Sequence, residues 1–215
     1  MKIEIIAFTP SPEQLIEDAA RICYDSFEKK GPGSHVRIIE HLIRSGHESV
    51  LEHASVTFRV GGVSRALTHQ LVRHRLASYS QRSQRYVKET EPQYVTPPSI
   101  ENWEGKFELE VNTPARKAWV NFALNEFDAA MNKCWETYNN LLKLGIKGED
   151  ARFVLPNACQ SEIIITMNFR ELRHFFKLRT SKHAQWEIRD MAKEMWNQVM
   201  RIGAANVFGD IVFEE

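Results

Sequence analysis

The residues best suited to chemistry are concentrated between positions 53 and 88, where the chain carries six arginines and one lysine but no acidic side chain. Positions 73 to 85 of this stretch hold three serines and four arginines: Arg73, Arg75, Arg82 and Arg85. Arginine grips a phosphate through two parallel N–H groups, and serine hydroxyls can fill the remaining oxygens. The stretch therefore predicts a site for a small anion. The alternatives are a solvated basic loop and a single-stranded nucleic-acid-binding module, in which the arginine-rich 73–85 loop acts with Tyr79 and Tyr86 as stacking platforms.

A further arginine continues the apolar side of a helix predicted over residues 169 to 179. Asn168 can cap this helix, with Glu171 at the third helical position as in a capping box. The apolar stripe has spacings of three and four residues and consists of Leu172, Phe175, Phe176 and, at its end, Arg179. A charge on such a stripe is costly unless it is paired. Either Arg179 extends from the helix end into solvent, or an anion, or a group that becomes anionic, lies beneath it.

Other candidate groups carry weaker signals. Arg170 and His174 lie four residues apart on another side of the same helix. Arg152 is either part of a surface salt bridge with a neighbouring carboxylate or a ligand for a distant group, and both interpretations stay open. Cys159 has no adjacent histidine in the sequence, so a role as nucleophile has little support.

Composition excludes several classes of protein. The 215 residues are 43% hydrophobic and 26% charged, with 28 basic and 28 acidic side chains, which is an ordinary globular balance. The zero net charge disfavours a protein that coats nucleic acid. No apolar run approaches the roughly 20 residues that span a bilayer, so we expect no membrane partner. Three widely separated cysteines, and histidines without the i, i+4 spacing of a zinc-binding helix, predict no metal site and a reducing, cytoplasmic location.

These groups must be positioned by an α+β fold. Sequence patterns predict strands over residues 2–8, 54–60 and 163–167, the second of them ended by Gly61-Gly62. They predict helices from Pro12, over 35–45 with Ser34 as its cap, and over 63–75, 114–144, 169–179 and 184–206, with a long loop at 89–112. The helix over 63–75 would place Gln70, Arg73 and His74 on one face. We expect a single domain over residues 1–215, with a small, mostly antiparallel sheet packed with several long helices.

A series of short motifs runs through most of the chain. Arg73-His74-Arg75 is followed, after seven residues, by Ser83 and Arg85. The other motifs are Gly46-His47-Glu48-Ser49, Ala151-Arg152, Asn168-Phe169-Arg170 and Leu178-Arg179. In this order, from about residue 13 to 210, the chain resembles the flavin-dependent thymidylate synthases.

The resemblance implies reductive methylation of dUMP to dTMP, with methylenetetrahydrofolate as the one-carbon donor and NADPH as the reductant through FAD. It also implies a homotetramer whose active sites are each assembled from several subunits. The residues implied to bind dUMP are Gln70, Arg73, Gln81, Arg82, Ser83, Gln84, Arg85, Arg152 and Arg179. Those implied to hold FAD are Ser49, Arg73, His74, Arg75, Gln81, Asn168, Arg170 and His174. Many family members carry Asn-Glu where this chain has Ser80-Gln81, so that carboxylate is absent here.

The uracil ring is a poor nucleophile at C5 unless negative charge builds up on it. Ser83 lies in the signature, but its sequence neighbours offer no base that could activate it as a nucleophile. A guanidinium beside the ring favours the deprotonated or enolate-like form, because an opposite charge lowers the pKa of the ring N–H. We therefore expect Arg179 to be catalytic and Ser83 only to bind. A flavoprotein that reduces or methylates another nucleotide is a further alternative.

Overall fold

The structure is a computed structural model that describes residues 1–102 and 113–214. They group into two compact units. The first unit contains Met1–Gly61, Leu67–Gln81 and Glu162–Glu215, and the second contains Gly62–Ala66 and Arg82–Ser161. The expectation of a single domain over residues 1–215 stays a prediction.

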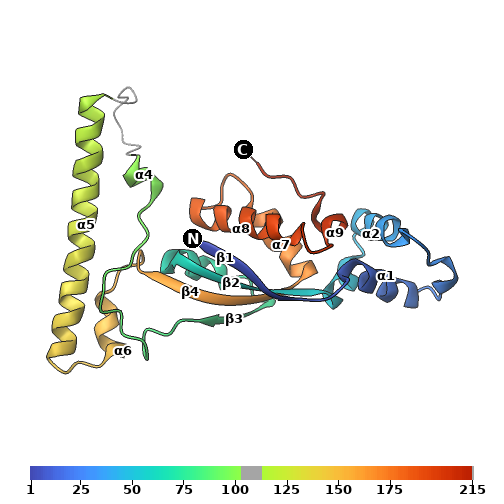
Figure 1. The fold of residues 1–215 in the computed structure, drawn as a ribbon, viewed down its shortest axis with the longest axis horizontal. Helices are drawn as coiled ribbons and strands as arrows, with labels where there is room; N and C mark the ends of the chain where they lie inside the picture. The colour runs from blue at the N-terminus through green and yellow to red at the C-terminus, as the bar shows by residue number, and fades with distance from the viewer. Residues whose placement is uncertain (103–112, 215) are drawn as a thin grey trace. The chain divides into compact units, whose positions relative to one another are not determined.

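A four-stranded sheet with the strand order β1-β2-β4-β3 lies mainly in the first unit (Figure 1). Its strands are β1 (Lys2–Phe8), β2 (Ser55–Ser64), β3 (Ala77–Gln81) and β4 (Gln160–Asn168). β1 is antiparallel to β2, with Lys2 opposite Gly61, and β3 is antiparallel to β4, with Ala77 opposite Met167. A small, mostly antiparallel sheet accompanied by helices confirms the predicted α+β fold class.

The sheet has one fully buried face. Alternate residues of its central strands are at most 1% exposed, namely Val56, Phe58, Val60, Ile163, Ile165 and Met167. This period of two is what a strand with one face against a core requires. The intervening positions are more polar, and the hydroxyls of Thr57 and Thr166 form a hydrogen bond of 2.9 Å between the two central strands.

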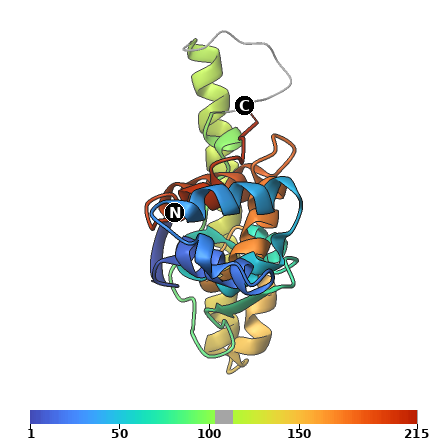
Figure 2. The same ribbon diagram turned by 90° about the vertical axis from the view of Figure 1, so that its right-hand side faces the viewer.

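Two helices lie along the sheet, α7 (Phe169–Arg179) and α8 (Trp186–Val199) (Figure 1). They contribute the fully buried side chains Leu172, Phe175, Phe176, Ile188, Met191 and Met195. The other helical segments of the first unit are α1 (Pro12–Ile22), η1 (Phe27–Lys29), α2 (Ser34–Arg44), η2 (Glu48–His53) and α9 (Ala205–Phe208). α1 and α2 pack side by side, as Figure 2 shows. α3 (Arg65–Leu71) begins in the second unit and ends in the first.

The second unit is built on one long helix, α5 (Pro114–Lys143), which Thr113 caps by accepting a hydrogen bond from the backbone N–H of Arg116 at 3.2 Å. The shorter segments are α4 (Pro98–Glu101), α6 (Gly148–Ala151) and η3 (Arg152–Val154). Met131 and Trp135 of α5 form a core with Cys159. Across the described residues, no helix combines the length and apolarity needed to cross a membrane.

Several element boundaries predicted from the sequence are wrong. Gly61-Gly62 does not end the second strand, because Gly61 pairs with Lys2 and Gly62 adopts a φ of 69°, which glycine tolerates, so β2 continues to Ser64. Ser34 is not the cap of α2, because Gly33 occupies the cap position with a φ of 71°. The helix predicted over 184–206 ends at Val199, and α9 follows after a turn.

The largest correction concerns the basic stretch itself. The helix predicted over 63–75 ends at Leu71, and two tighter turns follow, in which the N–H groups of Arg73 and His74 bond to the carbonyls of Gln70 and Leu71. The next residues, predicted as a loop, form the edge strand β3. The 89–112 segment contains α4, and its residues 103–112 lie outside the described part of the chain.

An ion pair anchors the C-terminal segment to α7. Arg173 is 0% exposed, and its two terminal nitrogens donate to the carboxylate oxygens of Asp210 at 2.6 and 2.7 Å. It also donates to the carbonyl oxygen of Val207. The Oε1 atom of Glu48 lies 3.6 Å from Nε of Arg173 and 3.6 Å from Nζ of Lys177. The same arginine therefore holds both the C-terminal segment and a side chain of η2.

Candidate functional site

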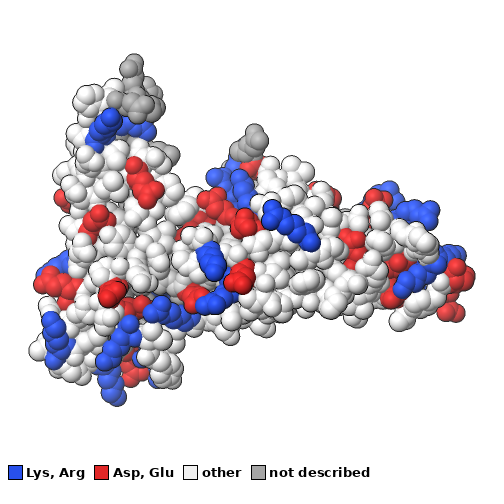
Figure 3. Space-filling view, viewed as in Figure 1, with Lys and Arg blue, Asp and Glu red and all other residues white. Residues whose placement is uncertain are grey.

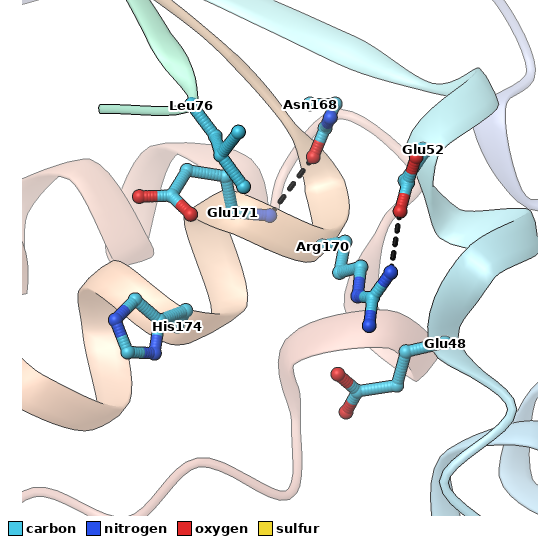
Figure 4. A pocket seen from close by; sticks show the side chains of 7 residues that line it. All are labelled: Glu48, Glu52, Leu76, Asn168, Arg170, Glu171 and His174. Atoms are coloured by element: carbon cyan, nitrogen blue, oxygen red, sulfur yellow. Dashed lines mark hydrogen bonds and ion pairs between the residues drawn. The ribbon is translucent and has the colours of Figure 1, made fainter. Parts of the chain in front are cut away.

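α7 positions most of the candidate groups in the first unit. Asn168 caps it, since its Oδ1 accepts a hydrogen bond from the backbone N–H of Glu171 at 2.9 Å, as the sequence predicts. The cap fixes where the helix begins and therefore which side chains leave its first two turns on one side. These side chains line a cavity of about 610 Å³, formed by Glu48, Glu52, Leu76, Asn168, Arg170, Glu171 and His174 (Figure 4).

Carboxylates of η2 lie opposite the cationic residues of α7 in this cavity. Nη1 of Arg170 donates to Oε1 of Glu52 at 2.6 Å, and Glu48 lies beside the same arginine (Figure 4). The volume is within the range of small-molecule sites, which run from roughly 300 to 1,000 Å³. Three of the residues predicted to hold FAD are thus brought together: Asn168, Arg170 and His174.

At the other end of α7, Arg179 contacts the buried His74. Its Nε donates to Nε2 of His74 at 3.0 Å, and its Nη2 donates to the carbonyl oxygen of Gln70 at 3.3 Å. No acidic side chain among residues 1–102 and 113–214 forms an ion pair with Arg179. Burial lowers the pKa of this guanidinium from its ordinary value. The cation has therefore lost part of its hydration without gaining a carboxylate partner.

His74 must be neutral in this arrangement. The Nε–H of Arg179 can only donate, so the Nε2 atom that faces it accepts and carries no proton. The ring proton is therefore on Nδ1, which lies 3.4 Å from Oε1 of Glu171. Burial, with Arg179 and His174 nearby, lowers the pKa of His74 to about 4. At neutral pH the contact with Glu171 is thus one between an imidazole N–H and a carboxyl group, not an ion pair.

Two further side chains enclose His74. Glu171 is 6% exposed, and burial raises the pKa of its carboxyl group, against a smaller lowering effect of His174. The hydroxyl of Tyr79 lies 2.8 Å from the carbonyl oxygens of both Leu71 and His74. Burial raises the pKa of Tyr79, so its hydroxyl remains a donor. The backbone and the side chain of His74 are both held in place.

The other predicted residues of the first unit lie around this cluster or beside it. Arg73 and Arg75 are exposed on either side of the buried His74, and neither forms an ion pair with an acid in the described part of the chain. Nε2 of Gln81 donates to the hydroxyl of Thr68 at 3.1 Å. Ser49 is exposed on η2, next to the cavity residue Glu48.

Five predicted dUMP residues lie in the second unit. Two of them meet at one residue: Nε of Arg85 lies 3.1 Å from the carboxylate of Glu149, and Nε of Arg152 donates to the Glu149 carbonyl at 3.0 Å. Arg152 thus bonds a carbonyl oxygen and does not form the surface salt bridge that the sequence left open. Arg82 lies 3.5 Å from the carboxylate of Glu89.

The two candidate nucleophiles of the second unit are not activated. The Oγ of Ser83 accepts a hydrogen bond from the backbone N–H of Arg85 at 3.3 Å, and no basic side chain of the described residues bonds to this hydroxyl. Cys159 is buried, and burial raises the pKa of its thiol to about 11, although Gln84 donates to its sulfur at 3.4 Å. A thiol with this pKa is almost fully protonated at neutral pH.

Acidic side chains from other parts of the chain neutralise several arginines of the acid-free stretch at 53–88. Arg59 pairs with Glu162 at 2.5 Å, and Arg82 and Arg85 pair with acids that lie outside the stretch. On the face shown in Figure 3, basic and acidic side chains intermingle over α1 and α2.

Within the described ranges, no cluster of three or more histidine, cysteine or acidic side chains is arranged to hold a metal ion.

Sequence reasoning gave four cavity residues no role in this site. Glu48, Glu52 and Leu76 line the cavity, and Glu48 was noted only within the motif Gly46-His47-Glu48-Ser49. Glu171 lines the cavity while also facing His74, but the sequence predicted it only as a capping residue. The signal for the first two was available, because both carboxylates follow Gly46-His47 within one short helix. Tyr79 carried no signal for its role, because its hydroxyl bonds to backbone carbonyls, which any sequence provides.

An α+β fold that carries a cavity of small-molecule size and a partly buried arginine without a carboxylate partner in the described residues is typical of an enzyme that binds an anionic substrate. Comparison with known proteins gives the family. The family model described as "Thymidylate synthase complementing protein" matches residues 4–203. The flavin-dependent thymidylate synthase of Geobacter sulfurreducens is 43% identical over 98% of this chain and 86% of the relative. The enzyme of the same name from Clostridium tetani is 40% identical over 97% of this chain and 85% of the relative.

Solved structures agree with these relatives. A UMP/dUMP methylase, PolB of Streptomyces cacaoi, bound with 5-Br dUMP, matches with a TM-score of 0.79 and 28% identity, over 99% of this chain and 97% of that one. Thymidylate synthase X of Helicobacter pylori, solved with FAD and dUMP, matches with a TM-score of 0.72 and 25% identity over 100% of both chains. The chain belongs to the family of flavin-dependent thymidylate synthases. It is therefore an enzyme, which removes the nucleic-acid-binding module as its function.

Proposed function

We propose that this chain methylates dUMP to dTMP with FAD as cofactor, methylenetetrahydrofolate as the one-carbon donor and NADPH as the source of electrons. A methylene group becomes a methyl group only by gaining a pair of electrons, so this donor requires a reductant. The sequence relatives and the Helicobacter pylori structure with FAD and dUMP support the nucleotide and the flavin. The folate and the NADPH rest on the resemblance of the motifs.

The observation that carries the proposal is the state of Arg179. Its guanidinium is partly buried, it donates to a neutral imidazole and a backbone carbonyl, and it has no carboxylate partner in the described residues. A positive charge in such surroundings stabilises a negative charge that comes to lie beside it, because little water screens the two. A uracil ring that loses its N3 proton, or gains enolate character, supplies that charge. Its C5 then becomes nucleophilic enough to take up the one-carbon unit.

The residues around the first-unit cavity fit a flavin nucleotide. Arg170, His174 and Asn168 supply donors for pyrophosphate oxygens, and the exposed Arg73 and Arg75 add two cations without acidic partners in the described ranges. The carboxylates of the cavity are acceptors that match ribose hydroxyls or an adenine amino group. FAD held there would supply the electrons for the reduction, and the protein's own side chains bind, orient and shield the reactants.

Arginines of the second unit are proposed to bind the phosphate of dUMP. Arg85 and Arg152 both bond to Glu149. When the phosphate of dUMP binds, one of these arginines would leave Glu149 and form a bidentate contact with the phosphate instead. A homotetramer with shared active sites follows from the resemblance and is checked by light scattering of the purified protein. The three unpaired cysteines support the expectation of a cytoplasmic location.

The decisive experiment compares Arg179→Ala with Ser83→Ala in an assay of dTMP formation. We expect Arg179→Ala to lower kcat by about a thousandfold, the scale of losing a group that stabilises charge in the transition state. Ser83→Ala should keep measurable turnover with a raised KM for dUMP, because Ser83 only binds. Arg59→Ala is the matched control, since this exposed arginine of β2 is paired with Glu162 and is not among the residues proposed to bind or react. A Ser83→Ala protein that binds dUMP but makes no dTMP would show that the serine, and not Arg179, does the chemistry.

A second experiment separates related nucleotide chemistries. The purified protein should be yellow, and NADPH should bleach its flavin absorbance under anaerobic conditions. Tritium should then be released from C5-labelled dUMP in step with dTMP formation. UMP is the matched competitor, because the Streptomyces cacaoi methylase acts on UMP or dUMP by its name. Preferential methylation of UMP would show that this chain is a ribonucleotide methylase and would contradict the proposed function.

A further inference from the structure

The partly desolvated cation of Arg179 is held on one side by a chain of two buried groups, Glu171 and His74. Glu171 and His74 are 6% and 4% exposed, and Oε1 of Glu171 lies 3.4 Å from Nδ1 of His74. Nε2 of His74 accepts from Nε of Arg179 at 3.0 Å. Glu171 and Arg179 stand on the same helix, whereas His74 reaches them from the turn after α3. The histidine thus bridges the first turn of α7 to its last.

The geometry of the bridge works with only one protonation state of His74. If Nε2 carried a proton, two N–H groups would face each other at 3.0 Å and the Nε–H of Arg179 would lose its acceptor. A free histidine distributes its proton over both ring nitrogens, and here both neighbours favour the Nδ1–H form. Arg179 requires an Nε2 atom without a proton. Glu171 stabilises the same form from the other side, because its oxygen is the acidic acceptor that faces Nδ1.

The distance of 3.4 Å between Glu171 and His74 has its own consequence. It is longer than an ordinary N–H···O hydrogen bond, so the carboxyl group acts on the imidazole mainly through electrostatic attraction for the Nδ1–H group. Burial works in the same direction, since it disfavours a charged imidazolium. The ring packs edge-on against Phe175, with 5.0 Å between centroids, and this contact fixes the plane in which both nitrogens point.

We propose that Glu171 is a positioning residue for the reaction, which fixes the Nδ1–H tautomer of His74 and thereby holds the Arg179 guanidinium in place. The proposal rests on the proposed role of Arg179 in dUMP activation. Glu171 does not touch the reacting atoms and acts only through His74. Because Glu171 also lines the 610 Å³ cavity, this contact additionally joins the cavity wall to the activating arginine.

The test compares three substitutions in the flavin-loaded enzyme. Glu171→Gln keeps an acceptor oxygen for Nδ1–H without the charge, and Glu171→Met keeps the length of the side chain without the acceptor. We expect Glu171→Gln to stay within about threefold of the wild-type kcat and Glu171→Met to lose about tenfold, the scale found for groups that orient a functional histidine. Because Glu171 also lines the cavity, kcat is expressed per bound flavin, and the KM for dUMP should be unchanged in both. Glu194→Met, an exposed glutamate on α8, is the matched control and should leave kcat unchanged.

A direct readout of the tautomer keeps the proposal independent of activity. In protein labelled with nitrogen-15 at histidine, the His74 signals, assigned by their loss in His74→Gln, should report a proton on Nδ1 and none on Nε2. In Glu171→Met these signals should shift toward a mixture of the two tautomers, whereas in Glu171→Gln they should match those of the wild type. Retention of both the wild-type signals and the wild-type kcat in Glu171→Met, or an equal loss in Gln and Met, overturns the proposal. If the wild type shows the tautomer but makes no dTMP, the proposed function has failed while the assignment of Glu171 as the group that sets the tautomer stands.

Discussion

Replacing Asp210 by asparagine should lower the free energy of unfolding by about 2 kcal/mol at neutral pH, because it leaves the buried Arg173 charged without its main partner. Arg173 is 0% exposed and donates to both carboxylate oxygens of Asp210 at 2.6 and 2.7 Å. Breaking a fully buried pair typically costs about 3–5 kcal/mol. The Asp210 side chain is 46% exposed, and Glu48 and the Val207 carbonyl remain near Arg173, so the loss here is smaller.

The measurement is urea unfolding of the flavin-saturated protein at a fixed protein concentration. Arg173→Met combined with Asp210→Asn removes both charges, and we expect it to recover part of the loss, with a coupling energy of about 1–2 kcal/mol in the double-mutant cycle. Glu214→Gln, in the same C-terminal segment but exposed, is the matched control and should change stability little. Additive effects of the two substitutions, or wild-type stability of Asp210→Asn, would refute the reasoning.

The pH dependence gives an independent check. The hydrogen bonds from Arg173 hold the pKa of Asp210 below its ordinary value of 3.8. The folded form therefore binds this proton less readily than the unfolded form, and the stabilisation is present above pH 3.8 and lost as the pH falls through the lowered folded value. The difference between the wild type and Asp210→Asn should persist at pH 5 and disappear only in stronger acid. A difference already lost at pH 5 would contradict this assignment.

Two further predictions concern a thiol and a helix cap. In the native protein, Cys159 should react with iodoacetamide at least about a hundredfold more slowly than the exposed Cys23, because a pKa raised from 9.0 to about 11 removes most of its thiolate. Mass spectrometry after timed labelling measures both rates, with urea-unfolded protein as the reference. Equal rates for the two cysteines in the native state would contradict the prediction. Asn168→Ala should cost about 1 kcal/mol of stability through the lost cap on Glu171, whereas Asn168→Asp should keep most of it. Urea unfolding at matched flavin content tests the pair, and an equal loss in both variants would show that the cap is not the cause.

Local signals predicted the parts of the fold that local contacts determine. The bounds of α7 follow from Asn168 and from the apolar spacing after it, and both lie within the helix or beside it. The first strand and the long helix from Pro114 were likewise readable. β3 was not, because Ala77-Ser78-Tyr79-Ser80-Gln81 is short and mostly polar, with only Ala77 and Tyr79 alternating with serines. It becomes a strand by pairing with β4, more than 80 residues away.

The candidate site divides in the same way. Arg179 could be singled out because an arginine on an apolar stripe is unusual in any sequence. Its contact with His74 could not be found, since the two residues are separated by 105 positions. The basic stretch misled for a related reason, because Glu162, Glu89 and Glu149, which neutralise three of its arginines, all lie outside it in the sequence.

The rigidity of α7 fixes the distance between Arg170 and Arg179. Arg170 at the cavity and Arg179 at the far end of the helix are nine residues apart, about 14 Å at a rise of roughly 1.5 Å per residue. The helix therefore fixes the distance between two cations that are proposed to bind different ligands. Inserting one residue within it would turn Arg179 by roughly 100° away from His74. Homologous chains should thus differ in length at their loops but never between the positions of Asn168 and Arg179.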